Sequence, residues 1–413
     1  MIPVDEALRL ILDRFQPLEP EMVQILEGLG RVLAEDIYSD LDIPPFDNSA
    51  MDGYAIQAAD TLGAIKEDPA RLRVVANLAA GHTTDVVVEP GTAIRIMTGA
   101  PLAAGADTVV RFEETSEYRA GKWELGEEVE VYNEVPLGSN VRPRGEDIRR
   151  GELALKRGTL LRAQEIGVLA SVGRAQYLVI RRPKVAILAT GDELVDIEED
   201  VGPGKIRNSN EYSNAALVQK YGGIPVRLGI ARDDVEELRS KVEQGLAAGV
   251  DLFLTSAGVS VGDYDIVKDV LGAEGKMHFW QVKMKPGKPL AFGEIRGVPL
   301  IGLPGNPVSA MVSFEQFVRP AMLKMLGRSR WEKPTMEVIV DHDIDAGKRR
   351  DFLRAVVEHR HDGYHAQVVS GPRGSGVLTS MVRANALLVV PEDVDRVKAG
   401  DRLEAQMLDW QWG

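Results

Sequence analysis

The stretch KVAILATGDEL, residues 184–194, determines the fold class of the central part of the chain. Its first seven residues form a short apolar run, and a glycine and two acids follow directly. Further apolar runs occur at 224–230 (IPVRLGI), 250–255 (VDLFLT) and 298–303 (VPLIGL), with amphipathic stretches between them. Alternating strands and helices are typical of a parallel sheet with crossover helices. We therefore predict a central α/β domain.

The segments on either side change to short period-two runs bounded by Gly, Pro and Asp. This pattern predicts small β domains, with a barrel or sandwich at the C-terminal end. The fold class is therefore α/β plus β, in a multidomain chain. The predicted domains are an elongated mixed α/β domain (1–45 and 143–180), an inserted β domain (46–142), the α/β domain with a parallel-rich sheet (181–330), and a C-terminal β domain (331–413).

Composition excludes several classes of function. The chain has 413 residues, no cysteine and a formal net charge of −14. Without cysteine there are no disulfides, thiolate zinc sites or cysteine nucleophiles. The acidic balance argues against a general nucleic-acid surface, which needs clustered Lys and Arg. No apolar run approaches the roughly 18 residues that span a bilayer, and acids stand where a signal peptide would be basic, so we expect no membrane segment and a cytoplasmic protein.

The loop ATGDEL places Asp192 and Glu193 directly after a predicted strand. Ligands of open α/β sheets bind at the carboxyl ends of the strands. Adjacent carboxylates are costly unless a cation or hydrogen-bond donors receive them. The alternative is an acidic helix N-terminus, which the helix dipole favours.

A second loop, SAGVSVGDYD at 256–265, follows the strand at 250–255. Its glycines permit close backbone approach and its hydroxyls can donate to phosphate oxygens, as in other glycine-rich anion loops. The alternative is a tight turn with capping residues. The absence of a Walker lysine argues against a nucleoside triphosphatase. The candidate residues are Ser256, Gly258, Ser260, Gly262 and Asp265.

A third loop, LPGNPVS, has Pro304 and Pro307 in a rigid turn and Ser309 at a helix start, a suitable seat for an oxyanion. Upstream, KMKPGKP places Lys283, Lys285 and Lys288 close together in an acidic chain. Isolated surface lysines are usually only solvated. Beside two anion-friendly loops, these lysines predict a pocket for a doubly charged ligand.

Polar loops of the inserted domain are a further set of candidates, although each could be only a turn. They contain Asp52, Thr98, Arg142 and Asp147.

Taken together, these segments resemble the molybdopterin molybdenumtransferases of the MoeA type, the family that includes the gephyrin E domain. The resemblance runs along the whole chain, in the family's order. It is carried by the motifs FDNSAMDGYA, RIMTGAPL, VRPRGEDI, ILATGDEL, NSNEYSNAAL, LTSAGVSVGDYD, MKPGKPLAFG and GLPGNPVSAMVSFEQF.

The resemblance implies a homodimer of four-part subunits with sites at the subunit interface. It also implies a reaction in which adenylylated molybdopterin and molybdate give molybdenum cofactor and AMP, with Mg²⁺. The adenylyltransferase of the same pathway is a candidate partner. We expect neither nucleic acid nor a membrane as a partner.

The resemblance also implies roles for single residues. Those near the cation and the pterin phosphate are Asp192, Glu193, Asp265, Ser256, Gly258, Ser260 and Gly262. Those around molybdate are Lys285, Lys288, Ser309, Arg354 and Ser375. Pro304 and Pro307 are further substrate-binding positions. Those that the partner subunit brings to the cleft are Asp52, Thr98, Arg142 and Asp147.

Several alternatives stay open at the level of sequence. The upstream basic position of the family falls on Gln281 or Lys283, and GDYD departs from family forms with a single acid there. The adenylyltransferase of the pathway shares similar α/β loops but lacks the flanking β domains. A scaffold role, as in gephyrin, would need a second module, and we expect none here. The sequence does not separate molybdate from tungstate.

Overall fold

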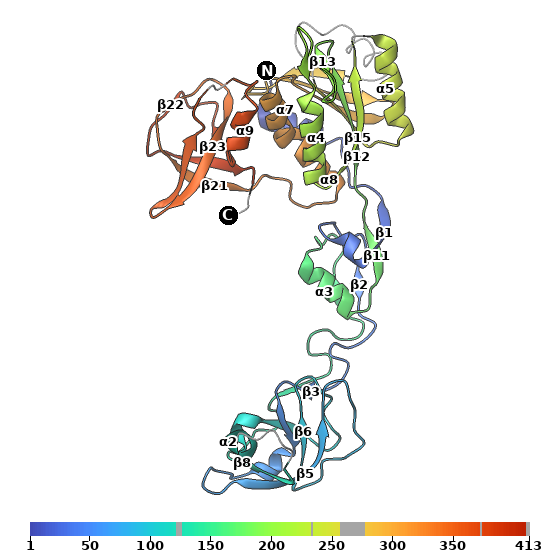
Figure 1. Ribbon diagram of the computed structural model, residues 1–413, viewed down its shortest axis with the longest axis vertical. Coiled ribbons are helices and arrows are strands. Elements are labelled where there is room, and N and C mark those ends of the chain that lie inside the picture. Colours follow the sequence, from blue (N-terminus) through green and yellow to red (C-terminus); the bar gives the residue numbers. More distant parts are fainter. Residues whose placement is uncertain (121–125, 233, 257–276, 372–373, 410–413) are drawn as a thin grey trace. The chain divides into compact units, whose positions relative to one another are not determined.

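The computed structural model describes residues 1–120, 126–232, 234–256, 277–371 and 374–409 (Figure 1). The chain divides into two compact units. Unit 1 comprises Met1–Val23, Gly30–Ala34 and Leu178–Gly413, and unit 2 comprises Gln24–Leu29 and Glu35–Tyr177. This division groups the first residues of the chain with the α/β domain, and the predicted domain boundaries stay a prediction.

A six-stranded sheet forms the centre of the α/β domain in unit 1, in the order β15-β12-β16-β20-β19-β17. The first four strands of that order run parallel, and β19 pairs antiparallel with both β20 and β17. The predicted strands at 184–190, 224–230, 250–255 and 298–303 are confirmed. The strands are β12 (Lys184–Thr190), β15 (Ile224–Ala231), β16 (Leu252–Ser256), β17 (Met277–Gln281), β19 (Pro289–Ile295) and β20 (Val298–Leu303).

Helices cover both faces of this sheet because successive strand residues point to opposite sides. Val185 and Ile187 of β12 enter the core formed with α1, α4, α7 and α8, whereas Ala186 and Leu188 enter the core formed with α5. Figure 1 shows α5 across the sheet from α4. The helical elements are α1 (Val4–Leu12), α4 (Ser209–Lys220), α5 (Val235–Ala247), α7 (Pro307–Ser313), the π-helical η4 (Phe314–Val318) and α8 (Arg319–Met325).

The C-terminal part of unit 1 is a closed five-stranded β-barrel, in the order β23-β24-β21-β27-β25, with β25 pairing back onto β23. Closure leaves these strands without a free edge. The strands are β21 (Thr335–Val340), β23 (Arg350–Arg360), β24 (Gly363–Val368), β25 (Ala386–Val390) and β27 (Arg402–Met407). The prediction of a C-terminal barrel is thus confirmed.

Short elements complete unit 1. Strand β18 comes from the α/β domain but pairs in parallel with β23 of the barrel. The short elements are β13 (Leu194–Val195), β14 (Ile206–Arg207), β18 (Met284–Lys285), β22 (Ile344–Asp345), α9 (Thr379–Arg383) and β26 (Arg396–Val397).

Unit 2 contains a five-stranded mixed sheet in the order β7-β4-β6-β5-β8, with a hydrophobic core on each face. Its strands are β4 (Gly53–Ile56), β5 (Ala70–Leu78), β6 (Thr92–Ile96), β7 (Thr108–Arg111) and β8 (Glu128–Val131). Further elements are η1 (Ile25–Gly28), β2 (Ile37–Tyr38), β3 (Asn48–Ser49), η2 (Ala58–Thr61), η3 (Phe112–Glu114), α2 (Ser116–Ala120), β9 (Val141–Arg142), β10 (Leu153–Leu155) and α3 (Ala163–Ser171). Strands β1 (Pro20–Gln24) and β11 (Gln176–Ile180) carry the chain from one unit to the other.

Candidate functional site

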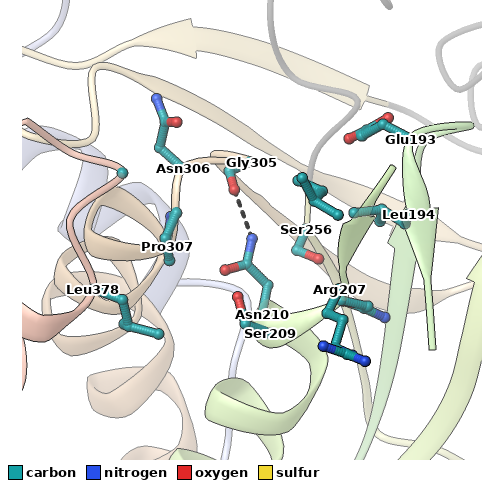
Figure 2. Close-up of a pocket in the computed structure, with 13 residues that line it drawn as sticks. Glu193, Leu194, Arg207, Ser209, Asn210, Ser256, Gly305, Asn306, Pro307 and Leu378 are labelled. Atoms are coloured by element: carbon teal, nitrogen blue, oxygen red, sulfur yellow. Dashed lines mark hydrogen bonds between the residues drawn. The ribbon is translucent and has the colours of Figure 1, made fainter. Parts of the chain in front are cut away.

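A cavity of about 560 Å³ lies at the carboxyl ends of the parallel strands, and we call it the strand-end cavity. Figure 2 shows Glu193 and Leu194 on one side of this cavity and Asn306 and Pro307 on the other. Ligands of open α/β sheets bind at this edge. The lining residues are Glu193, Leu194, Ile206, Arg207, Asn208, Ser209, Asn210, Ser256, Gly305, Asn306, Pro307, Gly376 and Leu378.

Two neighbouring strands deliver polar groups to this cavity. Ser256 ends β16 opposite Ala189 of β12, and it is only 1% exposed. Glu193 follows the end of β12 after Gly191, whose φ of +140° favours glycine. A Cβ atom at Gly191 would lie 2.4 Å from Oε2 of Glu193, so the missing side chain leaves room for this carboxylate.

The acids Asp192 and Glu193 do not begin a helix. The chain turns there and enters the short strand β13, and the next helix, α4, begins at Ser209. The alternative interpretation of this acidic pair as a helix N-terminus is therefore wrong. Both acids are exposed.

The first turn of α4 is held against the strand-end cavity by side chains to which the sequence analysis gave no role. Asn208 caps the helix by accepting a hydrogen bond from the Glu211 backbone N–H at 3.2 Å. Asn210 donates through Nδ2 to the Gly305 carbonyl at 2.7 Å (Figure 2). Its buried Oδ1 has no hydrogen-bond partner in the described chain. The motif NSNEYSNAAL could have suggested these residues, because asparagine is favoured at helix N-caps.

A second cavity, of about 430 Å³, gathers most of the positive charge predicted for an anion pocket, and we call it the basic cavity. Its lining includes the predicted Lys285, Lys288, Ser309, Arg354 and Ser375. The other lining residues are Pro286, Gly287, Pro289, Asn306, Ile344, Asp345, Arg349, Asp351, Leu353, Val368, Val369 and Gly374.

The pairing of β18 with β23 builds the basic cavity. It places Lys285 directly opposite Asp351, with 3.7 Å between Lys285 Nζ and Asp351 Oδ2. Arg354, three residues further along β23, is 7% exposed and donates through Nε to Ser380 Oγ at 3.2 Å. The Val308 N–H donates to the Ser375 carbonyl at 3.0 Å, which joins α7 to the segment that carries Ser375.

The backbone at Gly287 lies close to α7, and this contact positions the segment that carries Lys285 and Lys288. Gly287 has a φ of +101°, and a Cβ atom there would lie 2.5 Å from Ser313 Oγ of α7. A side chain at this position would therefore push Lys285 and Lys288 away from α7. The Val282 N–H donates to the Lys288 carbonyl at 2.8 Å, which holds the other side of the loop.

Asp351 and Asn306 are candidate residues that the sequence analysis missed. Asp351 is 1% exposed, and burial raises the pKa of its carboxyl although Lys285 and Arg349 oppose the shift. The available signal was an acid flanked by Arg350 and Arg354 in a predicted strand. Asn306 lines both cavities, so the two cavities adjoin at this residue. Nothing in the loop LPGNPVS alone could have shown that it serves two cavities.

Other predicted residues of unit 1 fall in different places. Pro307 lines the strand-end cavity and is the first residue of α7, whereas Pro304 lines neither cavity. Gln281 and Lys283 are also outside both linings, so the upstream basic position stays unassigned. Gly258, Ser260, Gly262 and Asp265 lie outside the described residues.

In unit 2, Asp52 and Thr98 form a pair. Asp52 Oδ1 accepts from the Thr98 backbone N–H at 2.7 Å and from Thr98 Oγ1 at 2.8 Å. These bonds lower the pKa of Asp52. Arg142 lies in β9 opposite Asn48, and the Asp147 N–H donates to the Ile43 carbonyl. All four predicted side chains are exposed.

Within the described residues, no group of three or more His, Asp or Glu side chains is placed to hold a metal ion. The predicted metal set remains untested because Asp265 is outside those residues. No helix in the described ranges is long and apolar enough to cross a membrane.

Family models match nearly the whole chain. The MoeA N-terminal region (domain I and II) matches residues 2–173, the "Probable molybdopterin binding domain" matches 186–324, and the MoeA C-terminal region (domain IV) matches 339–408.

Individual relatives agree with these models. Molybdopterin molybdenumtransferase 2 of Mycobacterium tuberculosis is 35% identical, with 98% of this chain and 99% of that protein covered. Molybdopterin molybdenumtransferase of a Nostoc species is 37% identical, with 90% of this chain and 85% of that protein covered. The crystal structure of the molybdopterin biosynthesis MoeA protein from Pyrococcus horikoshii matches with a TM-score of 0.83 at 32% identity, with all of both chains covered.

Proposed function

Because this chain belongs to the MoeA family of molybdopterin molybdenumtransferases, we propose that it inserts molybdenum from molybdate into adenylylated molybdopterin. The products are molybdenum cofactor and AMP, and the reaction is Mg²⁺-dependent. The observation that carries this proposal is the pair of adjoining cavities that meet at Asn306.

The strand-end cavity suits the pterin substrate. Its volume of about 560 Å³ is in the range of small-molecule sites. Ser256 and Asn210 line it with groups that can form hydrogen bonds with a polar ligand. Arg207 adds a positive charge for a phosphate group.

The basic cavity suits molybdate, a small dianion. Lys285, Lys288 and Arg354 supply charge, and Ser309 supplies a hydroxyl, from separate segments of unit 1. Charge-assisted hydrogen bonds of this kind hold oxyanions and stabilise charge that develops during reaction. Adjacent binding of both substrates brings the molybdenum close to the pterin sulfurs, and proximity supplies part of the rate.

The residues at the end of β12 fit a magnesium ion by their chemistry. Asp192 and Glu193 are adjacent, exposed carboxylates, and Glu193 lines the strand-end cavity. Mg²⁺ prefers oxygen ligands and commonly bridges one or two carboxylates and a substrate phosphate. Bound there, the ion would neutralise charge on the phosphoanhydride. Glu193 would then orient the ion, and Ser256 would orient the phosphate.

The direct test of the proposal uses the purified full chain with adenylylated molybdopterin, molybdate and Mg²⁺. AMP is measured by chromatography, and the cofactor is measured by activation of a molybdenum-free apoenzyme. We expect both products together, and neither without molybdate. AMP release that does not depend on molybdate, or AMP without active cofactor, would contradict the proposal. Adding tungstate in competition, followed by metal analysis of the product, determines which oxyanion is preferred.

Changing Glu193 tests the assignment of magnesium. We expect Glu193→Ala to raise the Mg²⁺ concentration needed for half-maximal AMP release by about tenfold or more, with thermal unfolding unchanged because the side chain is exposed. Glu198→Gln is the control, since Glu198 is also exposed but lies outside the cavity lining. An unchanged Mg²⁺ requirement in Glu193→Ala would remove this residue from the magnesium site.

A further inference from the structure

Asp351 is a buried carboxyl group in the wall of the basic cavity. It is 1% exposed, and its Oδ1 atom has no hydrogen-bond partner in the part of the chain that the structure describes. Its other oxygen, Oδ2, lies 3.7 Å from Lys285 Nζ. A buried polar atom that lacks a partner is uncommon and costs stability. Asp351 therefore lines the cavity with one oxygen near a cation and one that makes no hydrogen bond within the described chain.

A permanently ionised Asp351 would oppose the function proposed for this cavity. A carboxylate repels a dianion strongly where water is excluded, whereas a neutral carboxyl can donate a hydrogen bond to it. Burial raises the pKa of this carboxyl, against the opposing charges of Lys285 and Arg349. Binding of a dianion would raise the pKa further, because like charges disfavour ionisation.

Four cationic side chains and one further acid line the cavity beside Asp351. Lys285 and Lys288 come from β18 and the loop after it, Arg349 directly precedes β23, and Arg354 lies within β23. Asp345 of β22 is exposed, so water solvates its carboxylate.

We infer that Asp351, in its neutral form, donates the proton with which an oxide of molybdate leaves as water. This inference rests on the proposed function, because it needs molybdate in the basic cavity and a pterin thiol beside it. In one exchange, MoO₄²⁻, a thiol R–SH and the Asp351 carboxylic acid give [MoO₃(SR)]⁻, water and the Asp351 carboxylate. One Mo–O bond breaks and one Mo–S bond forms, and the thiol and Asp351 each supply one proton of the water.

The same geometry explains how the carboxylate product is tolerated. After the proton is transferred, Lys285 lies within ion-pair distance of Asp351. The charge of the bound oxyanion falls from −2 to −1 in the same step, so the repulsion on Asp351 also falls. The group can then take a proton from water for the second exchange.

The first test measures molybdate binding alone, between about pH 6 and pH 9. Binding favours the neutral carboxyl, so the affinity of the wild type should be highest at low pH. It should weaken by up to about tenfold per pH unit above the pKa of free Asp351. Asp351→Asn should remove this dependence, because an amide cannot ionise. Asp345→Asn, in the same cavity but exposed, should keep it.

The second test separates binding from chemistry. At saturating molybdate, Asp351→Asn should lower the rate of metal insertion by about 10²- to 10⁴-fold, the usual range for loss of a general acid. Its molybdate affinity near pH 6 should stay within a few fold of the wild type. A purely structural residue would instead change affinity and thermal unfolding together.

Contradicting outcomes differ for the two proposals. A wild-type protein that neither binds molybdate nor forms cofactor would contradict the proposed function. A wild type that does both, with a molybdate affinity that does not change between pH 6 and 9, would overturn only the role of Asp351.

If Asp351→Asn does not fold, calorimetry of the wild type tests the inference instead. Molybdate binding is measured in two buffers with different ionisation enthalpies, which gives the number of protons taken up. Proton uptake on molybdate binding at the high-pH end supports the inference, and its absence throughout overturns it.

Discussion

At the scale of single residues, four cationic side chains surround the basic cavity, although the chain as a whole is acidic. Lys285, Lys288, Arg349 and Arg354 line it, whereas the formal net charge of the whole chain is −14. Charge gathered in a concave, partly desolvated site acts more strongly than the same charge spread over a surface. The contribution of one such residue can therefore be measured by deleting it.

We predict that Lys288→Ala raises the molybdate requirement roughly ten- to a hundredfold. A charge-assisted contact to a dianion contributes on the order of 1.5 to 3 kcal/mol, which corresponds to that range. Affinity for the pterin adenylate should change much less, because Lys288 lines only the basic cavity of the two. The measurement is the initial rate as a function of each substrate.

High molybdate should partly restore the rate of Lys288→Ala. Lys348→Ala is the control, because Lys348 is exposed and outside the cavity lining. A wild-type molybdate dependence in Lys288→Ala, or equal losses for both substrates, would show that Lys288 does not hold the oxyanion.

At the scale of elements, a buried charged cluster joins α4, η4 and the segment before β21. Glu315 in η4 forms an ion pair with Lys333, whose side chain is 5% exposed. Tyr221, directly after α4, donates to Glu315 Oε1 at 2.8 Å, and the Arg319 guanidinium lies over its ring. Burial lowers the pKa of Lys333, although Glu315 opposes the shift. The buried polar and charged groups of this cluster keep their partners only while all members are present.

We predict that Glu315→Gln lowers the free energy of unfolding by about 3 to 5 kcal/mol, because it leaves a buried lysine without a countercharge. The exposed pair between Arg402 and Glu337 provides the control, and Glu337→Gln should cost roughly 0 to 1 kcal/mol. Urea unfolding of both variants measures the difference. Equal, small losses would mean that the buried pair does not stabilise unit 1.

The barrel contains a histidine whose contribution to stability depends on pH. His365 Nδ1 lies 2.8 Å from Asp341 Oδ1, and Nε2 lies 3.0 Å from Asp362 Oδ1. The contact with Asp341, followed by that with Asp362, raises the pKa of His365 above its ordinary value of 6.5. A group with a raised folded-state pKa stabilises fully below its unfolded pKa and loses that effect as pH rises through the folded one.

We therefore predict that His365→Gln destabilises the protein more at pH 6 than at pH 9. Urea unfolding at the two pH values gives the comparison. His361→Gln is the matched control, since the side chain of His361 is 93% exposed. A loss in His365→Gln that is the same at both pH values would show that the charge of His365 does not contribute.

At the scale of the whole molecule, the functional candidates fall in both units of the chain. The two cavities belong to unit 1, and the pair of Asp52 with Thr98 belongs to unit 2. The contacts with Thr98 lower the pKa of Asp52, and both residues are exposed. The family resemblance implied that such residues act in the site of a partner subunit of a homodimer, and this remains a prediction.

Mixing two inactive variants tests that prediction. If Asp52 serves the site of the partner, subunits with Asp52→Ala and subunits with Lys288→Ala should together form heterodimers with about one working site. We expect AMP release at low molybdate to recover on mixing, when neither variant alone is active. Subunit exchange is confirmed independently by tagging one variant. No recovery despite exchange would contradict a shared site.

The sequence by itself determined the elements and the chemical types of the site residues. Short apolar runs between amphipathic stretches located the four parallel strands of the central sheet, but not β17 and β19, and period-two patterns indicated a small C-terminal β domain, because side-chain direction along a strand or helix follows sequence spacing. The sequence also located the loop after β12 and the lysine segment 283–288, because glycine, acidic residues and lysine each indicate a local structure or charge without knowledge of the fold. It did not distinguish a turn from a helix N-terminus at Asp192, since acids suit both.

Only the tertiary structure decided which of these residues meet. The pairing of β18 with β23 places Lys285 opposite Asp351, and the turn before α7 places Asn306 against both cavities. Such contacts depend on strand register between segments far apart in the chain, and register is set by the packing of the whole unit. Burial then decided the properties of the groups. The same aspartate that is ionised on a surface has a raised pKa at position 351, because the fold removes it from water.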